Sequence, residues 1–293
     1  MSDQSYLPEK TQVRRAFARA AADYDAAAVL QREVATRLEG RLDLIRQVPA
    51  RVLDVGAGTG LATRDLMKRY PKAQVTALDI APPMLRLARR RAPLFRRMPC
   101  VCADAEALPF RPDSFDLLFS NLTIQWCHDL DRVFQGFLRV LAPGGLLMFT
   151  TYGPDTLREL RQAWAGVDGY NHVNAFYDMH DIGDALVRAG FADPVMDVET
   201  FTLTYRSVRD LMRDLKQIGA HNVTTGRPRG LTGRGRMQAV EQAYEAHRMV
   251  DGRLPASYEV VYGHAWVPPQ KPQRRGDDGV VRVPISRIGR RGP

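Results

Sequence analysis

Three glycines and one acidic residue have types and a spacing that could hold a small organic ligand. Gly56, Gly58 and Gly60 follow an apolar run, and Asp79 ends the next apolar run, nineteen residues after Gly60. Glycine permits both a sharp turn from a strand into a helix and a close approach of the backbone to a ligand. A carboxylate at the tip of the following strand can accept hydrogen bonds from the vicinal hydroxyls of a ribose. The four residues therefore predict a site for a nucleoside.

The loop departs from the pattern that binds a dinucleotide. A pyrophosphate on a helix N-terminus requires G-x-G-x-x-G, whereas here the spacing is G-x-G-x-G and Leu61 follows. Asp54, at the mouth of the turn, would repel a phosphate but suits a cofactor with an ammonium and a sulfonium. S-adenosylmethionine carries both groups, so the loop favours it over NAD. Taken alone, the glycines could also mark an ordinary tight turn.

Apolar periodicity predicts the elements that position these residues. Strands are predicted at 51–55, 74–79, 98–102, 115–120 and 145–151, with helices at 60–69, 82–91 and 129–140. This alternation is typical of a parallel sheet with right-handed crossovers. A helix at 181–189 and strands near 195–205 and 257–267 follow. The predicted fold is α/β and Rossmann-like, with a seven-stranded, mostly parallel sheet and helices on both faces.

Two helical segments lie outside this core. Residues 9–47 are periodic with a break at 23–25, which predicts two helices packed over the mouth of the cofactor site. Two more helical patterns lie between the last two strands. The predicted organisation is an N-terminal helical lid segment at 1–48, a cofactor-binding core at 49–206, a helical insertion or lid at 207–252, a last core strand at 253–267 and a flexible basic tail at 268–293.

The net charge of +9 is concentrated at one end of the chain. Residues 268–293 contribute +5 and the other residues contribute +4. This tail is rich in proline and glycine, so it cannot bury enough apolar surface to order itself. The charge is therefore weak evidence for RNA, and no nucleic-acid partner is expected.

The start of the chain has no signal-peptide pattern, and no apolar run approaches the ~18 residues that a membrane span needs. A cytoplasmic protein without a membrane partner is expected; oligomeric state is not predicted. Cys100, Cys102, Cys127 and His128 could together bind a metal, but they contain no C-x₂-C pair. Buried thiols are favoured, and no metal is expected.

Further motifs follow the glycine loop in order. Cys102–Ala105 ends the third strand with an acid, Phe115–Asn121 forms the fourth strand, and Leu141–Phe149 turns into the fifth. With the loop, they resemble the class I S-adenosylmethionine-dependent methyltransferases. The resemblance implies that Asp104 contacts the adenine and that the last two strands form an antiparallel hairpin. The predicted cofactor-binding residues are Gln31, Asp54, Gly56, Gly58, Gly60, Asp79, Ile80, Asp104, Ala105 and Asn121.

Three more segments bear on the acceptor: residues 15–31, residues 149–160 with G-P-D-T-L-R-E-L, and residues 218–234 with R-G-L-T-G-R. They are similar to the biotin-pathway methyltransferases that esterify the free carboxyl of malonyl-[acyl-carrier protein]. This resemblance spans about residues 11–266. It implies an O-methyltransferase whose substrate is carried by an acyl-carrier protein.

Such a reaction has requirements that can be assigned to residues. A malonyl carboxylate is already ionised at neutral pH, so the enzyme needs alignment and exclusion of water rather than a general base. Arg158, just beyond the fifth strand, is the predicted carboxylate clamp, because a guanidinium matches a carboxylate and keeps its charge. The alternative is a solvated helix face on which Arg158 pairs with Glu159.

Aromatic and amide side chains complete the predicted site. Tyr24 and Phe17 join Arg158 in the predicted catalytic set as walls near the methyl group, and Gln31 is placed at the amino-acid end of the cofactor. Ordinary helix packing is the alternative for these three. Gln125 and Trp126 follow the fourth strand and could shape the methyl channel. No role is assigned to residues 171–174.

An acidic carrier protein would dock on a basic surface. The predicted docking residues are Arg209, Arg213, Lys216, Arg227, Arg229, Arg234 and Arg236. A solvated helix face is the alternative for each of them. Three other functions stay open: methylation of a small carboxylic acid or quinone precursor, methylation or binding of RNA, and cofactor binding without turnover.

Overall fold

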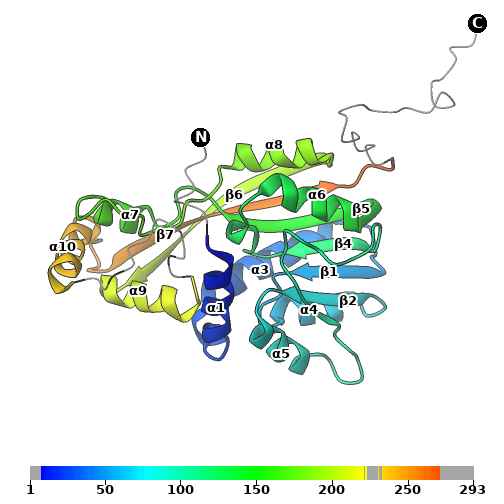
Figure 1. Ribbon diagram of the computed structural model, residues 1–293, viewed down its shortest axis with the longest axis horizontal. Helices are drawn as coiled ribbons and strands as arrows, with labels where there is room; N and C mark the ends of the chain where they lie inside the picture. The colour runs from blue at the N-terminus through cyan, green and yellow to red at the C-terminus, as the bar shows by residue number, and fades with distance from the viewer. Residues whose placement is uncertain (1–7, 221, 223–229, 231–232, 271–293) are drawn as a thin grey trace, which may run out of the picture.

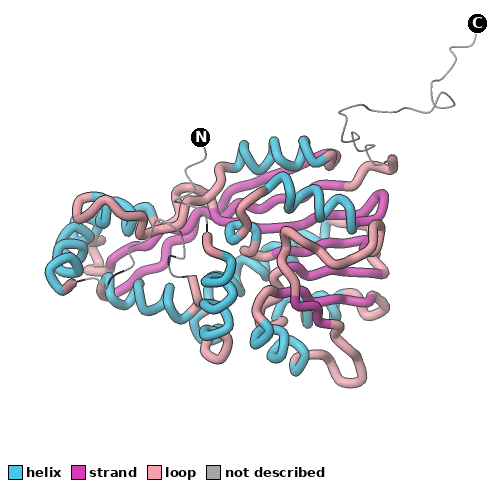
Figure 2. Tube along the Cα trace, viewed as in Figure 1, coloured by secondary structure: helices cyan, strands magenta, loops and turns pink. Residues whose placement is uncertain are grey.

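A seven-stranded sheet runs through the molecule in the order β3-β2-β1-β4-β5-β7-β6 (Figures 1 and 2). The computed structural model describes residues 8–220, 222, 230 and 233–270. The strands are β1 (Arg51–Val55), β2 (Gln74–Asp79), β3 (Cys100–Cys102), β4 (Phe115–Ser120), β5 (Leu141–Tyr152), β6 (Ala192–Tyr205) and β7 (Leu254–Trp266). Strands β1 to β5 are parallel, and β7 pairs antiparallel with both β5 and β6. The predicted sheet is confirmed.

Different helices cover the two faces of the sheet. Val52 and Leu53 are neighbours in β1, yet they lie in two separate buried clusters because successive strand side chains point to opposite faces. Residues of α3, α4 and α5 join the Val52 cluster, and residues of α6 and α8 join the Leu53 cluster. These helices are α3 (Val29–Arg41), α4 (Leu61–Arg69), α5 (Pro82–Arg90), α6 (Leu130–Val140) and α8 (Met179–Ala189).

The N-terminal segment forms three helices, where the sequence predicted two. They are α1 (Lys10–Ala20), α2 (Tyr24–Ala27) and α3, followed by a 3₁₀ turn at Leu42–Leu44. The chain bends between α2 and α3 at Ala28, whose ψ of 49° is not helical. Alanine is a strong helix former, so its sequence gives no break signal. Ala28 is 1% exposed, so the bend lies at a position that is buried by tertiary packing.

Helices also surround the far ends of β6 and β7 (Figure 1). Helix α7 (Arg158–Ala165) follows β5, and α9 (Val208–Gln217) and α10 (Arg234–Tyr244) lie between β6 and β7, as predicted for a helical insertion. Helix α7 packs on α10 and on β7. Among the described residues, no helix has both the length and the apolar character needed to cross a membrane. Most of the predicted flexible tail, residues 271–293, lies outside the described residues.

Candidate active site

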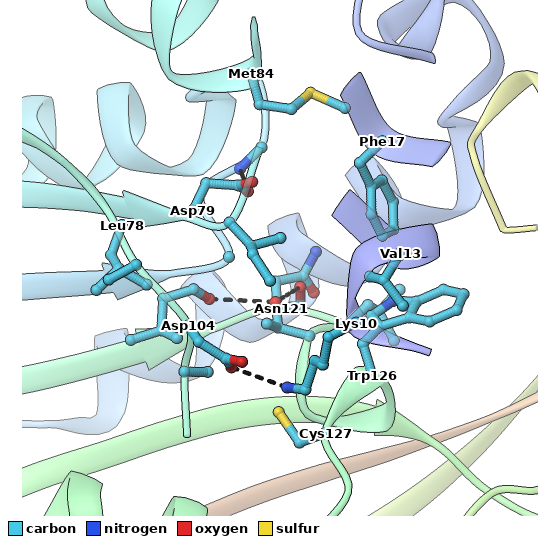
Figure 3. A pocket seen from close by; sticks show the side chains of 18 of the residues that line it. Lys10, Val13, Phe17, Leu78, Asp79, Met84, Asp104, Asn121, Trp126 and Cys127 are labelled. Atoms are coloured by element: carbon cyan, nitrogen blue, oxygen red, sulfur yellow. Dashed lines mark hydrogen bonds and ion pairs between the residues drawn. The ribbon is translucent and has the colours of Figure 1, made fainter. Parts of the chain in front are cut away.

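The carboxyl ends of β1, β2 and β4 open into one cleft (Figure 3). Its space is about 650 Å³, including the part open to solvent. Helix α1 closes the other side. The lining residues include Lys10, Val13, Phe17, Tyr24, Gly56, Gly58, Asp79, Ile80, Met84, Asp104, Ala105, Asn121, Thr123, Trp126 and Cys127.

Asp79 lies at the tip of β2, as predicted, and is 8% exposed. Its Oδ2 accepts the Gly58 N–H at 2.9 Å, and its Oδ1 accepts the Ala81 N–H at 2.8 Å. Burial raises the pKa of this carboxyl to about 6, although the backbone donors oppose the rise. Each carboxylate oxygen has a further lone pair. Asp79 can therefore accept hydrogen bonds from two ligand hydroxyls while the backbone holds it in place.

The glycine loop is shaped for close approach. All three glycines have positive φ, between 54° and 82°. A Cβ on Gly60 would lie 2.6 Å from the Cα of Ala88 in α5, so packing requires glycine there. A Cβ on Gly58 would meet no protein atom within 4 Å, although Gly58 lines the cleft. The backbone at Gly58 thus leaves open space beside Asp79, which fits a nucleoside cofactor.

The third acid, Asp104, pairs with a lysine that the sequence analysis did not identify. Lys10 Nζ lies 2.8 Å from Asp104 Oδ1 and 2.6 Å from Glu106 Oε2 (Figure 3). This pair joins the start of α1 to the end of β3. Lys10 and Asp104 are 94 residues apart, so no local pattern signals their contact. Met84 and Thr123, two other lining residues, were missed for the same reason.

Asn121 lies in the cleft and links the loop after β4 to neighbouring elements. Its Nδ2 donates to the Gln31 carbonyl at 3.1 Å, and its Oδ1 accepts the Thr150 hydroxyl at 2.8 Å. Gln31 itself does not line the cleft; its Nε2 lies 3.3 Å from the Tyr152 hydroxyl. In this structure Gln31 supports Asn121 through its backbone.

The N-terminal helices supply the aromatic walls. Phe17 packs edge-on against Trp126, with ring centroids 5.3 Å apart, and both line the cleft. Burial raises the pKa of Tyr24 well above its ordinary value, and the Asp79 and Asp25 carboxylates add to the rise. The Tyr24 hydroxyl therefore stays protonated. Asp25 accepts the Thr59 hydroxyl at 2.6 Å, which fixes α2 onto the glycine loop.

Asp54 and Gly60 lie beneath the cleft and do not line it. Asp54 is 1% exposed, and its carboxylate accepts a hydrogen bond from the Thr63 hydroxyl. Burial raises its pKa to about 7, although the Thr63 hydroxyl opposes the rise. The sequence predicted Asp54 at the mouth of the turn. Its side chain is buried because β1 is an inner strand of the sheet, paired with both β2 and β4.

The raised pKa of Asp54 predicts how stability depends on pH. The folded protein binds this proton more tightly than the unfolded chain, so stability is lost as pH rises through about 7. Between pH 6 and pH 8 the group accounts for about 1 kcal/mol. Urea unfolding of the ligand-free protein should show that Asp54→Asn removes this part of the difference. An equal pH 6 to pH 8 difference in both proteins would contradict the prediction.

The structure does not bring Arg158 to the cleft. Its side chain is 52% exposed at the start of α7, 3.7 Å from Asp155 and 3.4 Å from Glu159. This is the solvated helix face that the sequence left as an alternative. The turn after β5 brings Leu157, which is 6% exposed, into the core, and the next side chain therefore faces outward.

No metal site is evident in the part of the chain that the structure describes. No group of three or more His, Cys, Asp or Glu side chains there could hold a metal ion. The expectation of buried thiols is right only for Cys127, because Cys100 is half-buried and Cys102 is exposed. β3, which carries the latter two, is an edge strand of the sheet.

Known proteins with similar sequences are methyltransferases. The family described as "Methyltransferase domain" matches residues 53–149. A malonyl-[acyl-carrier protein] O-methyltransferase of Laribacter hongkongensis is 59% identical over 94% of this chain and 95% of its own length. The protein of the same name from Halorhodospira halophila is 56% identical, over 95% of both chains.

Solved structures share the fold at low identity. YcgJ of Bacillus subtilis has a TM-score of 0.56 and 16% identity, covering 79% of this chain and 97% of its own. A SAM-dependent methyltransferase of Thermotoga maritima has a TM-score of 0.52 and 18% identity, covering 87% of this chain and 99% of its own.

Proposed function

The chain belongs to the malonyl-[acyl-carrier protein] O-methyltransferase family, and from this membership we propose its reaction in detail. It transfers the methyl group of S-adenosylmethionine to the free carboxylate of malonyl-[acyl-carrier protein], giving the methyl ester at the start of biotin synthesis. The observation that carries the proposal is 59% identity over nearly the whole of both chains. The cytoplasmic location and the domain boundaries expected from the sequence stay predictions.

The cofactor supplies an electrophilic methyl group on a sulfonium. The protein's part on this side of the cleft is to bind and orient. Asp79 accepts the ribose hydroxyls, Gly58 lets the backbone approach, and Asp104 with Ala105 lies on the adenine side. The backbone hydrogen bonds to Asp79 and the Lys10 pair with Asp104 support this assignment, because both acids are held before a ligand binds.

On the acceptor side we propose neutral hydrogen-bond donors in place of an arginine clamp. Among the described residues that line the cleft, the cation is Lys10, and two carboxylates already neutralise it. The protonated Tyr24 hydroxyl can donate to a carboxylate oxygen and align it. Methylation removes the negative charge of the acceptor, so a neutral donor opposes the reaction less than a cation would. Phe17 and Trp126 exclude water from the same place.

Tyr24→Phe tests this assignment. The variant loses one hydrogen bond to a charged acceptor, so kcat should fall about tenfold with little change in the KM for the cofactor. Steady-state kinetics with the cofactor concentration varied at saturating acceptor measure both constants. Tyr70→Phe, at the far end of α4, is the matched control. Full activity of Tyr24→Phe, together with a large loss of activity in Arg158→Ala, would contradict this assignment and support Arg158 as the carboxylate clamp.

The reaction itself is tested with purified protein and labelled S-adenosylmethionine. Malonyl-[acyl-carrier protein], malonyl-CoA, malonate and bulk RNA are offered as separate acceptors. We expect a base-labile methyl ester on the carrier-linked malonyl group at the highest kcat/KM. Label that appears only on malonate or only on RNA would refute the proposal.

The carrier protein is proposed to dock beside α9 and α10. Arg209, Arg213 and Arg236 form ion pairs with Glu241, Asp210 and Asp168, which reduces their free charge. Lys216 and Arg234 are exposed on the same helices. Arg227 and Arg229 lie outside the described residues.

Reversing both exposed charges, with Lys216→Glu and Arg234→Glu, should raise the KM for the carrier-bound acceptor about fivefold at low salt and weaken its salt dependence. Steady-state kinetics at two ionic strengths measure this effect. Lys72→Glu combined with Arg111→Glu, two exposed positions before β2 and β4, makes the same change in net charge and is the control. Equal effects of the control and the double variant would place the docking surface elsewhere.

A further inference from the structure

We propose that Asn174 binds an amide N–H of the acceptor's pantetheine arm, inside a corridor that leads from the cleft to α7 and α9. The inference rests on the proposed function, because an acyl-carrier protein presents its malonyl group on a long arm that contains amides. It assigns a role to the segment 171–174, for which the sequence predicted none.

The corridor consists of adjoining cavities that share walls. Trp126 lines both the cleft and a second cavity, which Tyr152 and Phe176 also line. Phe176 and Asn174 line this second cavity and a third one between α7 and α9. Both residues also line a fourth cavity, beside Asp168. Cavities that share wall residues therefore follow one another from the cleft toward α7 and α9, and the proposal places the arm along this series.

The walls of the path suit an extended chain. Its inner part is bounded by apolar side chains, including Leu157, Leu215 and Ile218, which match the methylenes and the thioester of the arm. Polar groups appear at the outer end, where His172 stacks on Trp164 at 3.5 Å and lies 2.7 Å from Asp168. Of the proposed docking helices, α10 packs on α7, which carries Trp164, and α9 lines the third cavity with Met212 and Leu215.

Among the buried polar side-chain atoms of the described residues that line this inner part, one is unpaired. Asn174 Oδ1 is buried and has no hydrogen-bond partner among the described residues. Leaving such an atom unpaired costs on the order of 1–3 kcal/mol, so its presence in a cavity wall points to a ligand that donates. A carboxylate cannot donate and would be repelled by a carbonyl oxygen. An amide N–H of the arm, several bonds behind the malonyl carboxylate, supplies the missing donor.

Two synthetic acceptors test the inference: malonyl-pantetheine, which carries amides, and the malonyl thioester of butanethiol, which carries none. For the wild-type protein, the amide-bearing acceptor should have the lower KM. Asn174→Ala should raise the KM for malonyl-pantetheine about fivefold to tenfold and change the KM for the butanethiol ester less than twofold. kcat should be nearly unchanged for both.

Controls separate recognition from folding. Gln162→Ala removes an exposed amide from α7 and should leave both KM values unchanged. Asn174→Leu keeps the side-chain size and should repeat the selective effect of Asn174→Ala. Because it removes the unpaired oxygen, its thermal unfolding temperature without ligand should equal or exceed that of the wild type.

The outcomes are distinct. Equal KM increases for both acceptors, or no increase for either, would overturn the role of Asn174 while leaving the proposed function intact. A wild-type protein that methylates neither acceptor nor the carrier-bound substrate would overturn the proposed function and this inference together.

Discussion

Asp79→Ala weakens the binding of S-adenosylmethionine by about 100-fold or more, the largest functional effect that we expect from a single substitution. The Asp79 carboxylate is buried and already oriented by the Gly58 and Ala81 N–H groups. Hydrogen bonds to a charged group are worth about 1.5–3 kcal/mol each, and the ribose makes two. Isothermal titration with S-adenosylhomocysteine measures the loss without turnover.

Two comparisons sharpen this prediction. Asp79→Asn keeps one acceptor oxygen and should lose less affinity than Asp79→Ala, whereas Asp65→Ala, on α4, should lose none. Because the pKa of Asp79 is about 6, affinity of the wild-type protein should also fall between pH 7 and pH 5, as the carboxylate gains a proton. Wild-type affinity in Asp79→Ala would show that the ribose binds elsewhere.

Gly60→Ala destabilises the fold, and Gly58→Ala weakens cofactor binding. The new Cβ at residue 60 would lie 2.6 Å from both the Cα and the Cβ of Ala88, and φ is +82°. Overpacking and left-handed strain together cost about 3 kcal/mol. At residue 58 the new methyl group meets only open cleft, so only the strain of about 1 kcal/mol applies to folding.

Urea unfolding ranks the two variants by stability, and titration with S-adenosylhomocysteine ranks them by affinity. The two rankings should be opposite. Gly60→Ala should have the lower free energy of unfolding. Gly58→Ala should fold and bind about tenfold or more weakly, because its methyl group occupies ligand space. A Gly58→Ala protein with unchanged affinity would mean that the cofactor does not approach this part of the loop.

The cleft combines two parts with different origins. The strand ends and the glycine loop form the cofactor side, and this part belongs to the sheet. The proposed acceptor side consists of α1 and α2 in the cleft and of the 171–176 segment and α9 in the cavities beyond it, all outside the alternating core. Asp25 joins the two parts by accepting the Thr59 hydroxyl of the glycine loop.

The sequence by itself determined the sheet and two of the three acids predicted at the cofactor site, Asp79 and Asp104, which line the cleft. Parallel strands give unbroken apolar runs, and the loop between β1 and α4 needs glycine at fixed positions, so both features are local and can be read along the chain. Asp79 follows directly, because the last residue of a parallel strand lies at the ligand edge of the sheet, whereas Asp104, two residues beyond β3, was predicted from the family resemblance. The antiparallel β6–β7 pair was likewise predicted from the pattern and the family resemblance.

Only the tertiary structure decided which further residues line the cleft and the cavities beyond it. Trp126 was predicted from the sequence, whereas Lys10, Met84 and Asn174 were not. These three residues come from segments far apart in sequence, and their contacts depend on how helices pack rather than on local residue types. The same holds for Arg158, whose type suits a clamp but whose helix turns it toward solvent. The type of a charged residue determines which interactions its side chain can make. The direction of that side chain is set by the buried neighbours that fix its helix.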